Sequence, residues 1–187
     1  VEAPSEGNLT NLIAERSWFE PNRLMLSRAL GQRWQKVTAR ELNDEVRAVA
    51  KGLIASGVEF GDRVAIMSKT RYEWAVLDFA IWFAGGISVP IYETSSQEQV
   101  HWILSDSGSS HFIGETPTMV DIAEAAHPSS LSHRWAITEN LLADLIAKGA
   151  HISDEAIENR RRLLRPETIA TIIYTSGTTG NPKAALY

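Results

Sequence analysis

The residues best suited to chemistry lie near the end of the chain, in a segment rich in glycine and hydroxyl side chains. Residues 174–183 read Tyr-Thr-Ser-Gly-Thr-Thr-Gly-Asn-Pro-Lys. Glycine lets a backbone approach a ligand closely, hydroxyl and free N–H groups donate hydrogen bonds to oxyanions, and lysine adds positive charge. This composition predicts a loop that binds the polyphosphate of a nucleotide.

The spacing differs from that of the common phosphate-binding loop, Gly-x-x-x-x-Gly-Lys-Ser/Thr. Gly180 follows Gly177 by three positions, and Lys183 follows Gly180 by three more. Ala184 stands where a serine or threonine would hold magnesium. The sequence therefore argues against a loop of that class. A plain Gly/Ser/Thr turn between two strands is the other interpretation.

Residues 174–183 instead match, without a gap, the signature Tyr-Thr-Ser-Gly-Thr-Thr-Gly-x-Pro-Lys of the AMP-forming adenylating enzymes. A second region, residues 61–108, resembles the N-terminal part of long-chain fatty acyl-CoA synthetases. Its stretch Pro-Ile-Tyr-Glu-Thr-Ser-Ser at 90–96 is most similar to bacterial, especially actinobacterial, enzymes. The resemblance covers roughly residues 8–183.

The resemblance implies a reaction in two steps. A carboxylate attacks the α-phosphate of ATP to give acyl-AMP and pyrophosphate, and coenzyme A then displaces AMP. Such chemistry needs two positioned anions, hydrogen-bond donors and Mg²⁺ rather than a protein nucleophile, and no residue of this chain is implied to be catalytic. The residues implied to hold the β- and γ-phosphates are Ser176, Gly177, Thr178, Thr179, Gly180 and Lys183. Thr175 is implied to lie beside the Mg²⁺; the alternative is that its hydroxyl only closes the end of a strand.

The resemblance also implies that residues 1–187 are the N-terminal portion of an AMP-binding adenylation domain. The later parts of the large domain and the C-terminal lid domain, with their adenine, ribose and magnesium motifs, would lie downstream. We therefore expect the chain alone to be inactive, within a parent that activates a long-chain fatty acid. The family has glycine after the lysine, whereas this chain ends in Ala-Ala-Leu-Tyr at 184–187, which we interpret as a truncated or non-native end.

Two other functions remain open. The first is a fatty acyl-AMP ligase that passes its product to a carrier protein; the second is a non-catalytic nucleotide-binding module. The intact Lys183 and hydroxyl residues argue against the second. The acyl chain length, a homodimer and peripheral contact with a membrane are left open by the sequence.

Strands and helices must alternate to position the loop. Apolar runs predict strands at 63–67, 87–91, 111–114, 135–138 and 168–174. Helices are predicted at 74–84, from the capping box at 95–98 up to Gly108, and at 117–126, 140–148 and 154–164. Capping boxes at 38–41, 70–73 and 95–98 predict three helix starts, and a helix at 8–16 and a hairpin of 24–27 with 34–37 precede the alternation. The pattern predicts an α/β fold with a mostly parallel sheet and helices on both faces, which binds ligands beyond the carboxyl ends of its strands.

Composition excludes several classes of function. Eighteen Lys and Arg against 23 Asp and Glu give a net charge of −5, which argues against nucleic-acid binding. The chain lacks cysteine, a signal peptide and an apolar run long enough to span a bilayer, so we expect a cytoplasmic protein.

Three other groups of residues are interpreted as structural. The five histidines have no metal-ligand spacing. Arginines 160–162 follow acidic residues in one helix, which predicts a solvated helix face. Trp74, Trp82 and Trp102 fall on apolar helix faces and are predicted to be core residues. The loops 128–134 and 149–153 are predicted to be exposed breaks.

Overall fold

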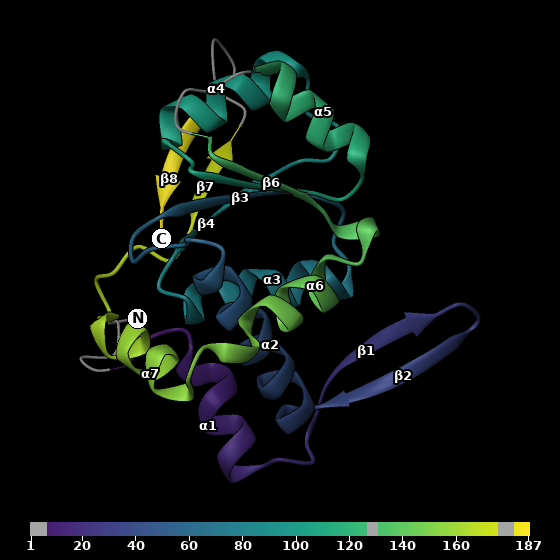
Figure 1. The fold of residues 1–187 in the computed structure, drawn as a ribbon, viewed down its shortest axis with the longest axis vertical. Helices are drawn as coiled ribbons and strands as arrows, with labels where there is room; N and C mark the ends of the chain where they lie inside the picture. The colour runs from purple at the N-terminus through teal and green to yellow at the C-terminus, as the bar shows by residue number, and fades with distance from the viewer. Residues whose placement is uncertain (1–6, 127–130, 176–181) are drawn as a thin grey trace.

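The computed structural model describes residues 7–126, 131–175 and 182–187. Its centre is a four-stranded sheet of order β4-β3-β5-β6, in which every neighbouring pair is parallel (Figure 1). The strands are β3 (Arg63–Met67), β4 (Ile87–Ile91), β5 (His111–Gly114) and β6 (His133–Ala136). The predicted α/β fold with a parallel sheet is confirmed, and β3, β4 and β5 have the predicted bounds.

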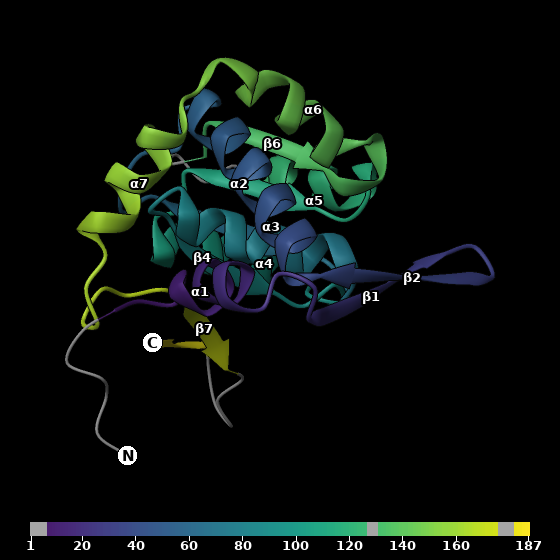
Figure 2. The same ribbon diagram turned by 90° about the horizontal axis from the view of Figure 1, so that it is seen from below.

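Helices cover both faces of this sheet. On one face lie α2 (Ala39–Ala55), α3 (Tyr72–Phe83) and α6 (Leu141–Lys148); on the other lie α4 (Gln97–Ser107) and α5 (Pro117–Ala126) (Figure 1). Helices α1 (Asn11–Phe19) and α7 (Asp154–Leu163) lie beside α2 and α3 (Figure 2), farther from the sheet (Figure 1). The 3₁₀ helices are η1 (Ile137–Glu139) and η2 (Gly149–His151).

Two hydrophobic cores result, one on each face of the sheet. Successive side chains of a strand point to opposite faces, so Val64 and Ile66 enter the first core, with α2, α3 and α6. Ala65 and Met67 enter the second core, with α4 and α5. Helix α3 is apolar on most sides because it lies between α2 and the sheet, as its sequence predicted.

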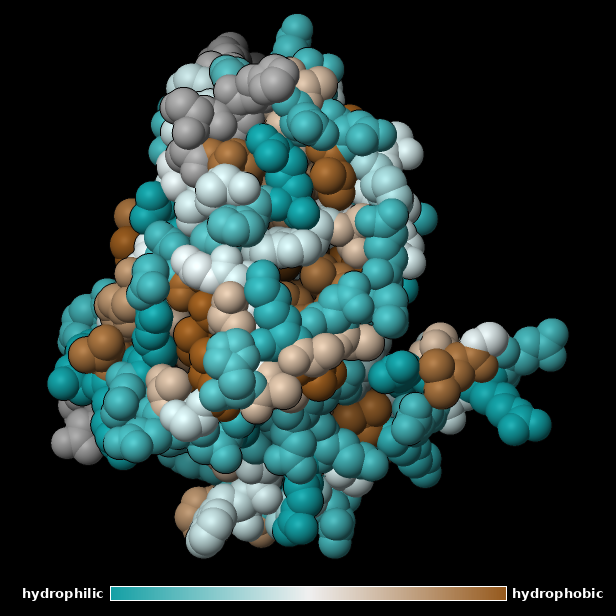
Figure 3. Space-filling model, viewed as in Figure 1, coloured by the Kyte–Doolittle hydropathy of each residue, from teal (hydrophilic) through white to brown (hydrophobic). Residues whose placement is uncertain are grey.

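The N-terminal hairpin is present and longer than predicted. Strands β1 (Leu24–Leu30) and β2 (Arg33–Thr38) pair antiparallel and stand out from the body (Figure 3). Only the base of this hairpin packs near α2 as expected, and Val37 is buried there. Trp34, near the turn of the hairpin, is 73% exposed. The first helix begins at Asn11 rather than at residue 8, because the Asn8 side chain accepts a hydrogen bond from the Thr10 N–H at 3.0 Å.

Two of the three predicted capping boxes need correction. Helix α3 begins at Tyr72 with Arg71 as its N-cap and no side-chain capping bond. The Glu73 carboxylate, which was expected to reach Thr70, binds Arg71 at 2.7 Å instead. The box of α4 is shifted by one residue, so that Ser96 rather than Ser95 is the N-cap.

The first capping box is confirmed and carries a prediction. Thr38 Oγ1 accepts from the Glu41 N–H at 3.3 Å, and the Glu41 carboxylate accepts from the Thr38 N–H at 2.8 Å. We expect Thr38→Ala to lower the free energy of unfolding by about 1 kcal/mol, because an orphan N–H at the start of α2 loses its acceptor. Urea unfolding measures the change. Thr70→Ala, at the box that does not form, is the control with no expected loss; equal losses would contradict the assignment.

The arginines of α7 are not a solvated face, so that prediction is wrong for two of them. Arg160 binds Glu59 at 2.7 Å, and its side chain is 18% exposed. Arg161 binds Glu158 at 2.8 Å, donates to Thr10 Oγ1 at 2.8 Å and lies over the Phe83 ring. These bonds fix α7 against its neighbours, which a helix sequence alone cannot reveal.

The other corrections concern loops and strand ends. The predicted strand 135–138 begins two residues sooner in the chain, at His133, ends at Ala136 as β6, and is followed by η1. The loop 149–153 is exposed at Ala150, His151 and Ser153, as predicted. It is not a break, however, because η2 packs against α2 and Gly149 is buried. Of the loop 128–134, residues 128–130 lie outside the described part, whereas Leu131 is buried and His133 begins β6. None of the helices in the described residues is both long and apolar enough to cross a membrane.

Candidate nucleotide-binding site

The signature segment connects the two strands of a hairpin. Strand β7 (Ile172–Thr175) pairs antiparallel with β8 (Lys183–Leu186), and Thr175 lies opposite Lys183 in the last pair before the connection. Side chains of directly opposed residues share one face of an antiparallel ribbon. Both side chains are exposed, so a hydroxyl and an ammonium group lie together where the loop begins and ends.

The remaining predicted site residues belong to the connection itself. Ser176, Gly177, Thr178, Thr179 and Gly180 lie outside the residues that the structure describes, and their roles stay predictions.

Strand β7 is attached to the edge of the parallel sheet. The Ser88 N–H in β4 donates to the Ala170 carbonyl at 3.0 Å, the Thr171 hydroxyl donates to the Ser88 carbonyl at 3.1 Å, and Ser88 and Thr171 form a parallel bridge. Because β7 runs parallel to β4, Thr175 lies toward the carboxyl ends of the sheet strands, where α/β folds bind ligands. The predicted strand 168–174 thus begins late, at Ile172. It is a hairpin strand beside the sheet because β8 satisfies its hydrogen bonds.

Helix α4 binds the hairpin on both sides of the loop. The Trp102 indole N–H donates to the Pro182 carbonyl at 3.0 Å, and the Tyr174 hydroxyl donates to Asp106 Oδ2 at 2.7 Å. Burial and the Asp106 carboxylate raise the pKa of Tyr174, so its hydroxyl stays protonated and can donate. The sequence did not connect Trp102 or Asp106 with this site.

A half-buried carboxylate that no sequence pattern predicts also lies at this edge of the sheet. Glu115, directly after β5, accepts from the Lys69 N–H at 3.0 Å and the Ser68 hydroxyl at 3.3 Å, and it pairs with Arg71 at 3.2 Å. Burial raises the pKa of Glu115, but these hydrogen bonds and the Arg71 charge outweigh it and lower the pKa below its ordinary value. Its oxygens are used to fix the loop after β3, which indicates a structural role.

Comparison with known proteins identifies the family. The sequence model of a family described as "AMP-binding enzyme" matches residues 18–187. This chain belongs to the AMP-binding enzyme family.

Two curated relatives of this chain are proteins of different kinds. This chain is 40% identical over 181 residues to the long-chain-fatty-acid–CoA ligase FadD15 of Mycobacterium bovis, an alignment that covers 94% of this chain and 30% of FadD15. It is 28% identical over 184 residues to a linear gramicidin synthase of Brevibacillus parabrevis, covering 98% of this chain and 3% of the synthase. The chain therefore spans only a minor part of either relative.

A solved structure supports the fold. The crystal structure of VinN superposes with a TM-score of 0.79 at 22% sequence identity, covering 99% of this chain and 44% of VinN. At that identity the likeness concerns the fold alone.

The residues that the structure describes fit magnesium only in part. In ranges 7–126, 131–175 and 182–187, no three His, Asp or Glu side chains gather in a way that could hold a metal ion. Magnesium commonly binds few protein oxygens and takes its other ligands from phosphates and water. The exposed Thr175 hydroxyl is an oxygen of the kind that can be one such ligand, and its role beside Mg²⁺ stays a prediction.

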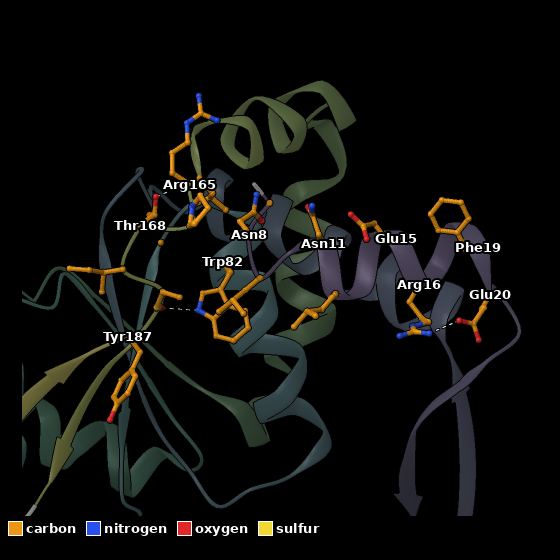
Figure 4. Close-up of a pocket in the computed structure, with 18 residues that line it drawn as sticks. Asn8, Asn11, Glu15, Arg16, Phe19, Glu20, Trp82, Arg165, Thr168 and Tyr187 are labelled. Carbon is orange, nitrogen blue, oxygen red and sulfur yellow. Dashed lines mark hydrogen bonds and ion pairs between the residues drawn. The ribbon is translucent and has the colours of Figure 1, made fainter. Parts of the chain in front are cut away.

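A cavity of about 780 Å³ lies at the other end of the hairpin, away from Thr175. Its walls come from α1, from the segment 164–170, and from Trp82 and Tyr187 (Figure 4). The Trp82 indole is half-buried and donates to the Ala170 carbonyl at 2.8 Å. Trp74 and Trp102, also half-buried, pack against the two cores as predicted. Trp82, a predicted core residue, instead forms part of the wall of this cavity.

Proposed function

We propose that this chain is the N-terminal, phosphate-binding portion of a long-chain-fatty-acid–CoA ligase, which converts a fatty acid to acyl-AMP and then to acyl-CoA. The observation that carries the proposal is the pairing of Thr175 with Lys183, which places a hydroxyl and a cation at the two ends of the signature segment. The identity with FadD15 favours a fatty acid as the carboxylate and coenzyme A as the acceptor.

Each residue has a role in this proposal. The Lys183 ammonium group neutralises charge on the β- and γ-phosphates, and hydroxyl or backbone N–H groups of Ser176, Gly177, Thr178, Thr179 and Gly180 donate to their oxygens. Thr175 is one ligand of Mg²⁺, which would spread the charge that develops on the leaving pyrophosphate. Adenine, ribose and most of the fatty acid would be held by later parts of the parent, so residues 1–187 alone are expected to release no AMP.

The second candidate is a fatty acyl-AMP ligase that passes its product to a carrier protein. The likeness to a linear gramicidin synthase favours it, because the adenylating family also occurs in such synthases. Both candidates share the adenylation step and differ only in the acceptor. The non-catalytic module is the alternative that the sequence argues against, a homodimer and peripheral membrane contact stay open, and the cytoplasmic location stays a prediction.

Calorimetric titration with Mg·ATP tests the phosphate site. We expect wild-type chain to bind Mg·ATP, and Lys183→Ala to weaken the affinity about tenfold, because a charge-assisted contact with phosphate is lost. Lys36→Ala removes the same charge from the exposed N-terminal hairpin and is expected to leave the affinity unchanged.

Two outcomes would contradict the proposal. Equal affinities of wild type and Lys183→Ala would remove Lys183 from the site. A folded wild-type chain that binds no Mg·ATP at millimolar concentration would not be a phosphate-binding unit by itself.

A further inference from the structure

Two side chains of α4 hold the hairpin on either side of the signature loop. The Trp102 indole donates to the carbonyl of Pro182, and Asp106 accepts from the hydroxyl of Tyr174. Pro182 directly precedes Lys183, and Tyr174 directly precedes Thr175. Each bond therefore acts one residue away from a described residue of the phosphate site.

The two side chains share one face of a helix that is itself anchored. Trp102 and Asp106 are four positions apart, which places them one above the other on α4. At its carboxyl end, Arg63 Nε donates to the Ser107 carbonyl at 3.0 Å, and another guanidinium nitrogen donates to the Gly108 carbonyl at 2.8 Å. Because Arg63 begins β3, the position of α4 is fixed relative to the central sheet.

The hairpin side of these bonds is restrained as well. Tyr174 is only 6% exposed, its ring packs in the second core, and its hydroxyl donates to the Asp106 carboxylate. The half-buried Trp102 ring packs against the same core. Buried donors need acceptors. The two bonds therefore favour one position of the hairpin relative to α4.

We propose that Trp102 and Asp106 are positioning residues of the phosphate site, which hold the two ends of the signature loop on α4 before the nucleotide binds. Preorganisation of this kind increases affinity because less ordering remains to be done on binding. The inference rests on the proposed function, and neither side chain is assigned a contact with the nucleotide.

Calorimetry with Mg·ATP on the 187-residue chain tests the inference. We expect Asp106→Ala and Trp102→Phe each to weaken the affinity about fivefold, the equivalent of one ordinary hydrogen bond. Asp106→Asn keeps an acceptor oxygen and is expected to retain the wild-type affinity within about twofold. In a Tyr174→Phe background, Asp106→Ala should cause no further loss, because the partner hydroxyl is already gone.

Matched controls separate positioning from general destabilisation. Ser105→Ala changes an exposed residue of α4, and Trp74→Phe repeats the tryptophan exchange in α3. Both are expected to bind as wild type. Amide exchange in the nucleotide-free chain is expected to rise at Thr175 and at residues 183–186 in Asp106→Ala and Trp102→Phe, and to stay unchanged in the controls.

The outcomes are distinct. If Lys183→Ala weakens binding but Asp106→Ala and Trp102→Phe do not, this inference alone is overturned. If Asp106→Asn loses as much affinity as Asp106→Ala, the hydrogen-bond role is overturned. If the folded wild type does not bind Mg·ATP, the proposed function fails and takes this inference with it. Asp106 is exposed, so the Asp106 series decides the matter even if Trp102→Phe fails to fold.

Discussion

Gly52→Ala is expected to lower the free energy of unfolding by about 3 kcal/mol, the upper end of the usual cost of overpacking. The sign is opposite to that of an ordinary helix position, where alanine is favoured over glycine by about 1 kcal/mol. A Cβ atom at position 52 would lie 2.1 Å from the Leu145 carbonyl oxygen and 2.5 Å from its carbon. These are backbone atoms of α6, so a side chain cannot rotate away and the helices must separate.

The contact is reciprocal, which strengthens the expectation. A Cβ atom at Gly149 would lie 2.4 Å from the Gly52 nitrogen and 2.6 Å from the Lys51 carbonyl carbon. Two glycines thus allow the backbones of α2 and of the end of α6 to touch. This contact brings Leu145 into the first core, where it is 2% exposed.

Urea unfolding followed by circular dichroism measures the effect of Gly52→Ala. Ala48→Gly, at a half-buried position of the same helix, is the control and should cost only about 1 kcal/mol through helix propensity. A Gly52→Ala chain as stable as wild type would show that α6 can shift away without loss of packing.

Asp78→Asn is expected to stabilise the chain at neutral pH, by up to about 3 kcal/mol, and to have no such effect near pH 4. Asp78 lies on α3 and is 8% exposed. Burial raises its pKa from the ordinary 3.8 to about 6, although the nearby Ser88 hydroxyl counteracts the rise. The difference between these values corresponds to about 3 kcal/mol in favour of the protonated form in the folded state.

The sign follows from proton binding in the two states. Below about pH 4 the carboxyl is protonated in both, and it imposes no penalty. Between about pH 4 and 6 the unfolded chain loses the proton while the folded chain keeps it, so rising pH lowers stability. Above about pH 6 the penalty is complete, and the neutral asparagine avoids it.

Urea unfolding of wild type and Asp78→Asn from about pH 4 to pH 8 tests this expectation. The difference between the two chains isolates Asp78 from all other titrating groups. Asp121→Asn, at an exposed position of α5, is the control and should show a difference that does not vary with pH. A constant difference for Asp78→Asn as well would mean that Asp78 ionises normally in the folded chain.

The sequence by itself determined the elements whose causes are local. Short apolar runs gave β3, β4 and β5 their bounds, and the Thr38 and Glu41 side chains mark the start of α2. The signature segment likewise pointed to the AMP-binding enzyme family before any fold was known, because its residue types and order suffice.

Only the tertiary structure decided how distant segments meet. Trp102 binds Pro182 across 80 positions, and Tyr174 binds Asp106 across 68. The close approach of Gly52 to α6 depends on how the two helices pack, and Arg161, predicted to be solvated, donates to Thr10 at the start of α1. Periodicity and capping are properties of neighbouring residues, whereas these contacts depend on the order of strands and the crossing of helices. The attachment of the two ends of the signature loop to α4 could therefore not be predicted from the sequence.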